Sequence, residues 1–372
     1  YTNASLAFLT RAGTPFLIQV TIQPEPASGP IAAPTVCSDT PVGYTLVTPG
    51  ASTYNVAINS NGLMQSGGTL SAGTGKAANE LADDVWTNIN NGFPSINVVY
   101  TITPVSAAGC SGDPFTVTVP VKPEPRGANH TAVLCSATAV NYNLQTTNIN
   151  GLGNGMASTF SWLAPVDNPN VTGESLVAQS TSVIGDILIN PTGIDQLVTY
   201  QVTPTGSVSL CTGDVFSITV TVKPAPIGVN QSVSTCSDVS PSYNLLNNIA
   251  ILGNNVGSTF SWVAAANANV TGESTVPVAG PRITDILNNV TNADQVVDYT
   301  VTPTGVNGCV GATFVIQVTV HPEPVGVNAT APTICSGNTV NYNLQNNVNT
   351  GNSLPSTFLW WATDNLNVSG EC

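Results

Sequence analysis

Cysteine is the residue type whose spacing in this chain points most directly to chemistry. The dipeptide Cys-Ser recurs with steps of 98, 101 and 99 positions, and a second cysteine follows each of the first three copies. The Cys-Ser cysteines are Cys37, Cys135, Cys236 and Cys335, and the later ones are Cys110, Cys211 and Cys309. No Cys-x-x-Cys pair is present, and no histidine recurs with them. The pattern therefore indicates disulfide bonds rather than a zinc site.

Two pairings of these cysteines are open. The first joins the two cysteines of each repeat, as Cys37–Cys110, Cys135–Cys211 and Cys236–Cys309. The second joins Cys110 to Cys135 across a repeat boundary. We expect the first, because the strand after Cys110 and its linker run roughly 30–40 Å at about 3.3 Å per residue, which separates Cys110 from the next repeat. Cys335 would then need a partner outside the sequence, and Cys372 has no counterpart in the other repeats. Such disulfides indicate an oxidising, extracytoplasmic setting.

Other residues that perform chemistry are sparse. The two histidines, His130 and His321, occur without a Gly-x-Ser-x-Gly nucleophile motif, and Asp83 and Asp84 would point apart in an extended chain. No His-Glu-x-x-His, phosphate-binding loop or dinucleotide fingerprint occurs. We therefore expect no catalytic site, no cofactor and no metal. Calcium at the junctions between repeats is an alternative, because acidic residues recur there, although no Asp-x-Asp-x-Asp loop supports it.

The charge of the chain restricts its partners. Lys plus Arg number 6 against 20 Asp plus Glu, for a formal net charge of −14 and a pI of about 4.1. Nucleic acids and anionic membranes recruit basic patches, so we expect neither as a partner. No run of about 18 apolar residues occurs, so we expect no membrane insertion.

The cysteines belong to a repeat that covers the whole chain. Each copy has a Tyr-x-x-Thr-Pro strand, which begins at Tyr100, Tyr200 or Tyr299, and ends in a Pro-x-Pro sequence. Copies of this size can each bury their own core, so we call them modules. The predicted bounds are 1–26 for the last strands of a truncated module, 27–125, 126–226 and 227–324 for complete modules, and 325–372 for the first part of another.

The strand pattern within a module predicts an all-β fold of tandem immunoglobulin-like β-sandwiches. Short strands alternate apolar and polar residues, turns separate them about every 8–12 residues, and a tryptophan lies in a central strand. Each tyrosine stands where a tyrosine corner would. The expected core residues are Trp162, Trp262, Trp360, Tyr100, Tyr200 and Tyr299. The first complete module has Tyr54 and Val56 in the strand where the others carry the tryptophan.

Two shorter segments carry further expectations. The sequence GDILIN at 185–190 is expected to form one turn of helix or a short edge strand, and its aspartate to cap that turn or accept backbone hydrogen bonds. Two prolines within three residues fix φ in each linker. They predict an elongated, semi-rigid rod of roughly 40 Å per module.

The module sequences also resemble a known family. VTYQVTPTGSVSLCTGDVFSITVTVKPAP and VDYTVTPTGVNGCVGATFVIQVTVHPEP, with ITDILNNVTNADQ before and ICSGNTVNYNLQ after the second, resemble the PKD-like repeats of giant Bacteroidetes cell-surface adhesins, the SprB-like gliding-motility family. The resemblance implies PKD-like modules, export by type IX secretion, and secretion and motility machinery as partners. It also implies an extracellular location, secreted or anchored at the outer membrane.

Three functional hypotheses follow. The first is a structural and adhesive array, a stalk or filament for surface adhesion, in which many weak modules on one chain give high avidity. The second is a carbohydrate-binding or spacer array of a secreted polysaccharide-degrading enzyme, which would show Trp162, Trp262 or Trp361 exposed and coplanar. The third is a self-assembling extracellular fibre built through exposed strand edges. The expected partners are adjacent modules of the same longer chain, surface polysaccharides or lateral copies of the chain.

Overall fold

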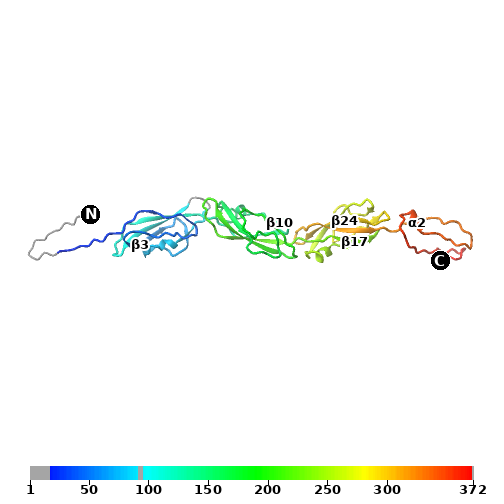
Figure 1. Ribbon diagram of the computed structural model, residues 1–372, viewed down its shortest axis with the longest axis horizontal. Helices are drawn as coiled ribbons and strands as arrows, with labels where there is room; N and C mark the ends of the chain where they lie inside the picture. The colour runs from blue at the N-terminus through cyan, green and yellow to red at the C-terminus, as the bar shows by residue number, and fades with distance from the viewer. Residues whose placement is uncertain (1–16, 91–94, 371–372) are drawn as a thin grey trace, which may run out of the picture. The chain divides into compact units, whose positions relative to one another are not determined.

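The computed structural model describes residues 17–90 and 95–370. It contains two compact units. The first runs to Gly127 and includes Ile149–Thr159 and Pro204–Asp214, and the second holds Ala128–Asn148, Phe160–Thr203 and the chain from Val215 onward. Strands make up most of the regular structure in both, with β3 in the first and β10, β17 and β24 in the second (Figure 1). Cys372 lies outside the described residues.

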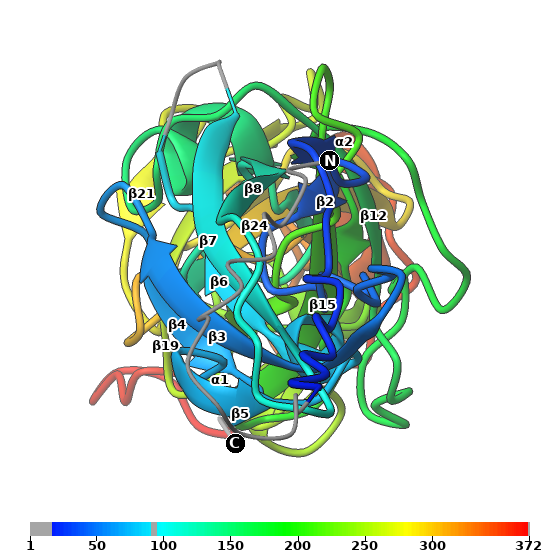
Figure 2. The ribbon, with the colours of Figure 1, turned by 90° about the vertical axis from the view of Figure 1, so that its left-hand side faces the viewer.

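One six-stranded sheet organises the first unit. Its order is β1-β8-β7-β3-β5, and β2 also pairs with β8. Strands β3 and β7 lie side by side in Figure 2. The sheet strands are β1 (Ile31–Ala32), β2 (Val36–Cys37), β3 (Ala51–Asn59), β5 (Gly73–Lys76), β7 (Ile96–Ser106) and β8 (Phe115–Lys122). A separate pair joins β4 (Met64–Gly67) to β6 (Val85–Thr87), and a 3-10 turn spans Glu80–Asp83.

The second module and the third each contain one main sheet, of four and five strands. The first has the order β12-β15-β16-β9, and the second has the order β17-β25-β24-β19-β21. Their strands are β9 (His130–Cys135), β12 (Ser158–Leu163), β15 (Gln196–Gly206), β16 (Phe216–Lys223), β17 (Gln231–Cys236), β19 (Ser258–Ala264), β21 (Val278–Ala279), β24 (Gln295–Gly305) and β25 (Phe314–His321). The all-β fold of tandem immunoglobulin-like modules is thereby confirmed.

Alternating burial explains why these segments form strands. In β16, Phe216, Ile218, Val220 and Val222 are buried, and the residues between them are partly exposed. Side chains of a strand point to opposite faces in turn, so this pattern buries one face of the sheet and leaves the other toward water. The β-branched residues that dominate both faces also favour the extended backbone.

Short elements complete the second module and the third. The pairs are β10 (Thr138–Ala139) with β14 (Ile187–Leu188), β11 (Tyr142–Asn143) with β13 (Val183–Ile184), β18 (Tyr243–Asn244) with β22 (Arg282–Ile283), and β20 (Val270–Thr271) with β23 (Asn288–Asn289). The sequence 185–190 thus contributes a short strand, not a helical turn. Helical turns occur instead at Leu144–Ile149, α1 (Leu246–Ala250) and α2 (Gln345–Thr350).

The predicted aromatic core forms in the complete modules. The rings of Trp162 and Tyr200 meet edge to face at 5.6 Å, and those of Trp262 and Tyr299 do the same at 5.6 Å. All four residues are buried. In the first complete module Trp86 on β6 supplies the indole that is missing from β3, and its ring lies 6.5 Å from that of Tyr100. A tryptophan from a different strand therefore takes the place of the one expected on β3, and the spacing of the repeats did not indicate this.

Trp360 departs from the prediction, because 61% of its surface is exposed. Trp162 and Trp262 are each covered by a tyrosine that follows 38 or 37 positions later, Tyr200 or Tyr299. Among the described residues after His321 no strand forms, so no sheet or tyrosine packs against this indole. The assignment of Trp360 to a core was therefore wrong for this structure.

The core tyrosines donate their hydroxyls to a recurring aspartate. The Tyr200 hydroxyl donates to Asp186 at 2.8 Å, and the Tyr299 hydroxyl donates to Asp285 at 2.9 Å. Asp186 also accepts the backbone N–H of Ser175 at 2.7 Å, so the expected acceptance of a backbone hydrogen bond is confirmed and the helix cap is not. Burial, then the hydrogen bond and charge of Asp186, raise the pKa of Tyr200, so this hydroxyl remains a donor.

Candidate functional site at the module junctions

Both disulfides of the described residues join one module to the next. Cys37 is bonded to Cys211 and Cys135 to Cys309, each pair with a Cα–Cα distance of 5.5 Å and a sequence separation of 174. The predicted pairing within modules, Cys37–Cys110, Cys135–Cys211 and Cys236–Cys309, is therefore wrong. The alternative between Cys110 and Cys135 does not form either. Cys110, Cys236 and Cys335 are free thiols.

Strand direction explains the pairing. The first strand of a module runs parallel to the last one, which places Cys37 opposite Lys122 and Cys135 opposite Lys223. These cysteines thus lie where the chain leaves the module. Cys110 precedes the last strand, whose eight residues span about 25 Å at about 3.3 Å each. A disulfide allows a Cα–Cα distance of at most about 7 Å, so Cys37 cannot reach Cys110.

An asparagine of the following module holds the linker backbone at three of the junctions. The Asn154 side chain accepts the N–H of Arg126 at 3.0 Å and donates to the carbonyl of Glu124 at 2.8 Å. Asn254 does the same for Ile227 and Ala225, at 3.0 and 2.8 Å. Asn352 repeats the arrangement at Val325 and Glu323, at 3.1 and 2.6 Å. A single side chain therefore fixes the backbone on both sides of the second proline.

Two glycines let the linker approach closely enough for these bonds. A Cβ atom at Gly213 would overlap the carbonyl oxygen of Pro125, and one at Gly153 would overlap that of Arg126. Gly311 and Gly253 stand in the same relation to Pro226 and Ile227. Pro123 and Pro125 are buried in this seat. The linker is thus packed into the start of the following module rather than left as a free tether.

Further contacts tie the hairpin that carries the late cysteine to the linker. The Lys122 ammonium donates to the carbonyl of Ser209 at 3.3 Å. At the next junction the Asn307 side chain donates to the carbonyl of Pro224 at 2.8 Å. Because Ser209 and Asn307 lie two residues before Cys211 and Cys309, these contacts hold the hairpin where its cysteine meets the preceding module's cysteine.

A carboxyl pair marks two of the junctions. Glu124 is 7% exposed and is hydrogen-bonded to Asp39. Burial, together with Asp39 and Asp214, raises the pKa of Glu124 to about 8, which makes it the protonated partner at neutral pH. Burial alone would raise the pKa of Asp39, but hydrogen bonds from Ser66, Thr87 and Glu124 lower it.

The same pair recurs at the end of the third complete module. Slight desolvation, then the hydrogen bond and charge of Asp238, raise the pKa of Glu323, although Glu323 is exposed where Glu124 is buried. The second complete module has Ala137 and Ala225 at these two positions, so both carboxyls are absent together. In the described residues no three His, Cys, Asp or Glu side chains lie close enough to hold a metal ion.

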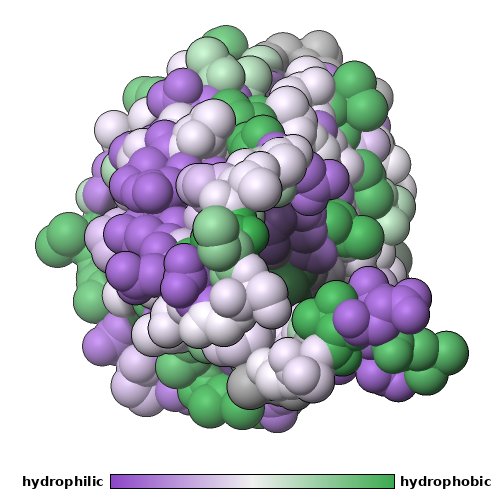
Figure 3. Space-filling view, turned by 90° about the vertical axis from the view of Figure 1, so that its right-hand side faces the viewer, coloured by the Kyte–Doolittle hydropathy of each residue, from purple (hydrophilic) through white to green (hydrophobic). Residues whose placement is uncertain are grey.

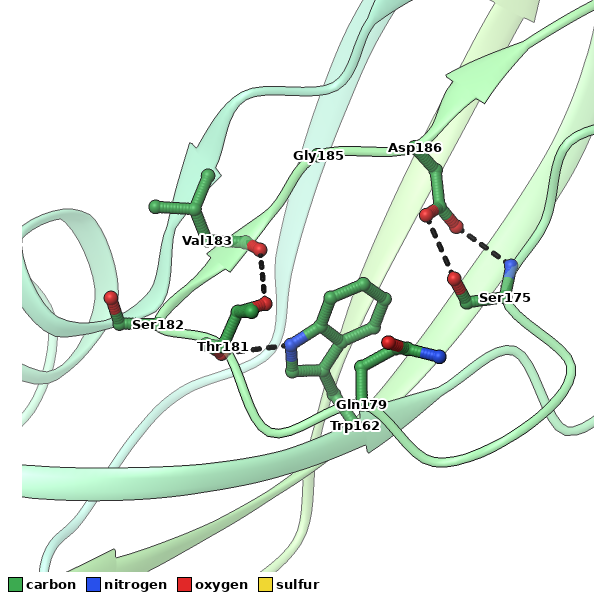
Figure 4. Close-up of a pocket in the computed structure, with 8 residues that line it drawn as sticks. All are labelled: Trp162, Ser175, Gln179, Thr181, Ser182, Val183, Gly185 and Asp186. Atoms are coloured by element: carbon green, nitrogen blue, oxygen red, sulfur yellow. Dashed lines mark hydrogen bonds between the residues drawn. The ribbon is translucent and has the colours of Figure 1, made fainter.

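A shallow pocket lies beside Trp162, and the polar groups of its lining are hydrogen-bonded to one another. It is lined by Trp162, Ser175, Gln179, Thr181, Ser182, Val183, Gly185 and Asp186 (Figure 4). The Trp162 indole donates to the carbonyl of Thr181 at 2.9 Å, and Asp186 accepts the Ser175 hydroxyl at 2.8 Å. These polar groups bond to one another, so they brace the loop rather than present a reactive site.

Comparison with protein families identifies the repeat. The profile of the PKD-like domain family matches residues 34–125, 132–226, 233–324 and 332–372. The chain belongs to the PKD-like domain family. Each matched segment of these PKD-like repeats begins near a Cys-Ser pair, and the first three end at or next to a Pro-x-Pro linker.

The solved structures that match this chain are of other proteins. The ectodomain of human desmocollin-1 shows 12% identity and a TM-score of 0.20, with 85% of this chain and 65% of that chain covered. Drosophila N-cadherin EC1-4 shows 13% identity and a TM-score of 0.20, with 82% of this chain and 76% of that chain covered. Chicken CNTN1 FN1-FN3 shows 11% identity and a TM-score of 0.23, with 73% of this chain and 89% of that chain covered. The PKD-like chain spans about two thirds of the desmocollin chain, and likenesses at these TM-scores carry no argument about function. A search of curated proteins gives no match.

The asparagine clamp, in which Asn154, Asn254 or Asn352 binds the linker backbone, was not predicted, although the sequence contains its signal. Gly153-Asn154, Gly253-Asn254 and Gly351-Asn352 are Gly-Asn pairs that recur at the module spacing. Such a pair usually indicates a turn, and only the contacts with the linker reveal its other role. No helix among residues 17–90 and 95–370 is long and apolar enough to cross a membrane.

Proposed function

We propose that this chain is the structural and adhesive repeat region of a large secreted or cell-surface protein, where it acts as a stalk or filament. The recurrence of one junction design supports this best. An asparagine clamp holds the linker at three junctions, and a disulfide joins consecutive modules at two of them. Joining modules in this way serves an array that must carry load. The module bounds 27–125, 126–226 and 227–324 are part of the proposal.

Disulfides support the extracellular part of the proposal, because they persist in oxidising compartments. Surface adhesion in gliding motility and export by type IX secretion rest on the sequence resemblance to giant Bacteroidetes adhesins. Surface polysaccharides and lateral copies of the chain are the proposed partners besides neighbouring modules.

The burial of the tryptophans counts against a carbohydrate-binding array. Trp162 and Trp262 are each 2% exposed, so neither offers a platform for a sugar ring. Trp361 is 78% exposed, but it lies in the partial module where Trp360 is also uncovered. On the face drawn in Figure 3, hydrophobic and hydrophilic residues are interspersed over short distances.

Deletion of residues 126–226 from the full-length protein in its host cell tests the proposal. The deletion removes Cys135 and Cys211 together and leaves Cys37 and Cys309 in consecutive modules, where they can pair. We expect the displayed protein to reach roughly 40 Å less far from the cell, about one module, and attachment to persist. Loss of attachment at an unchanged display level would contradict the proposal and would assign a specific binding site to that module.

A further inference from the structure

The two disulfides cross along the sequence. Their cysteines occur in the order Cys37, Cys135, Cys211 and Cys309, and the bonds join the first to the third and the second to the fourth. Residues between Cys135 and Cys211 therefore lie inside both covalent loops. Disulfides within single modules would form separate loops with only a peptide chain between them.

We propose that the crossed disulfides make this segment a doubly connected chain, which stays covalently continuous after one backbone cut and which resists lengthening under tension. This inference goes beyond the proposed function, because it holds whether or not the modules adhere to anything.

Continuity after a cut follows from the order of the bonds. A cut between Cys37 and Cys135 is spanned by the first disulfide, and a cut between Cys211 and Cys309 is spanned by the second. A cut between Cys135 and Cys211 is spanned by both. No single cleavage between Cys37 and Cys309 can therefore release a fragment while the disulfides are intact.

Resistance to lengthening follows from the shortest covalent route. Cys37 and Cys309 are 272 positions apart along the backbone. Either disulfide alone bypasses 174 of these positions and leaves 98. With both present, a route through both bonds runs back from Cys211 to Cys135 and uses 76 positions. At about 3.6 Å per residue, the greatest distance between Cys37 and Cys309 is roughly 980 Å without disulfides, 350 Å with either one and 270 Å with both.

The second disulfide therefore adds redundancy rather than length control. Loss of one bond frees 22 positions, the difference between 98 and 76, or roughly 80 Å at about 3.6 Å per residue. Loss of the remaining bond frees 174 positions, or roughly 630 Å at the same rise. An array joined in this way tolerates reduction of any one bond and lengthens fully only when both are gone.

Covalent continuity is tested with one protease site between Cys37 and Cys135 and another between Cys211 and Cys309. The site is inserted after Asp113 in one variant of the 372-residue chain and after Asp214 in another, both in exposed hairpins. After cleavage we expect one species of full mass by electrophoresis without reductant and two fragments with it. Release of a fragment without reductant would overturn the proposal. The same site between Gly326 and Val327, which neither disulfide spans, is the control that releases a fragment in both conditions.

Single-molecule stretching tests the resistance to lengthening. The full chain is compared with Cys37→Ser/Cys211→Ser, with Cys135→Ser/Cys309→Ser and with the variant that combines all four. We expect each pair variant to gain roughly 80 Å of final extension and the combined variant roughly 700 Å, from the 22 and 174 positions at about 3.6 Å each. Equal gains from the two successive removals would show independent bonds and overturn the proposal.

Discussion

Asn154 and Asn254 show how much of a junction one side chain can hold. Each amide satisfies a backbone donor and a backbone acceptor of the linker. These bonds are exposed or partly buried, and a hydrogen bond within a protein contributes about 0.5–1.5 kcal/mol net to stability. Polar amides thus hold the linker backbone at these junctions, beside the carboxyl pair of Glu124 and Asp39 and the ammonium of Lys122.

Glu124 is expected to make the stability of its junction depend on pH. Its pKa is about 8 when folded and near 4.5 when unfolded, so the folded protein keeps a proton that the unfolded chain has lost. The contribution is present below about pH 4.5, falls as the pH rises, and is lost above about 8. Glu124→Gln keeps a neutral hydrogen-bonding group and should unfold at a higher temperature than the wild type at pH 8.5, with little difference at pH 4.5.

The measurement is thermal unfolding across this pH range. Glu25→Gln removes an exposed carboxyl from the corresponding position of the first partial module and serves as the control. Its unfolding temperature should depend on pH with the same slope as that of the wild type. An unchanged slope in Glu124→Gln would show that the carboxyl is charged in the folded protein.

At the scale of elements, the junction is a linker seated against a hairpin and a helical turn. The β15–β16 hairpin contributes Gly213 and Cys211, and the turn after Leu144–Ile149 contributes Gly153 and Asn154. Because these glycines face carbonyl oxygens of the linker, the backbone itself forms the contact surface. Close approach of this kind depends on the absence of side-chain atoms.

Gly213→Ala is expected to destabilise this seat. Its new methyl group would overlap the Pro125 carbonyl, and overpacking of this kind costs about 1–3 kcal/mol. Gly185→Ala is the matched control, because a Cβ atom there meets nothing within 4 Å. Denaturant unfolding of both variants measures the difference. Equal stability of the two would mean that the linker shifts without cost.

At the scale of the whole molecule, the seven cysteines that the structure describes are either bonded in pairs or free. Alkylation of the oxidised, folded chain should modify Cys110, Cys236 and Cys335 and leave Cys37, Cys135, Cys211 and Cys309 unmodified, because only the first three are free. Peptide mass spectrometry without reductant gives the modified sites. The same reaction after reduction and denaturation is the control. Protection of Cys110 would restore the pairing within modules and contradict the structure.

The sequence by itself determined the repeat, the all-β fold, the burial of the recurring tryptophan and tyrosine of two modules and the use of cysteine for disulfides. These properties depend on local patterns: alternation along a strand, the spacing of Cys-Ser, and the absence of motifs for other chemistry. Even the distance argument that kept Cys110 away from Cys135 was sound, since it needed only the length of one strand.

The tertiary structure alone decided which cysteines pair, where the missing indole comes from and what seats the linker. The first strand of each module runs parallel to the last, so Cys37 lies at the opposite end of the module from Cys110. Trp86 reaches Tyr100 from another strand, and Asn154 meets linker residues that precede it by 28 and 30 positions. Strand direction and contacts between distant segments decide these features, and local sequence patterns predict neither.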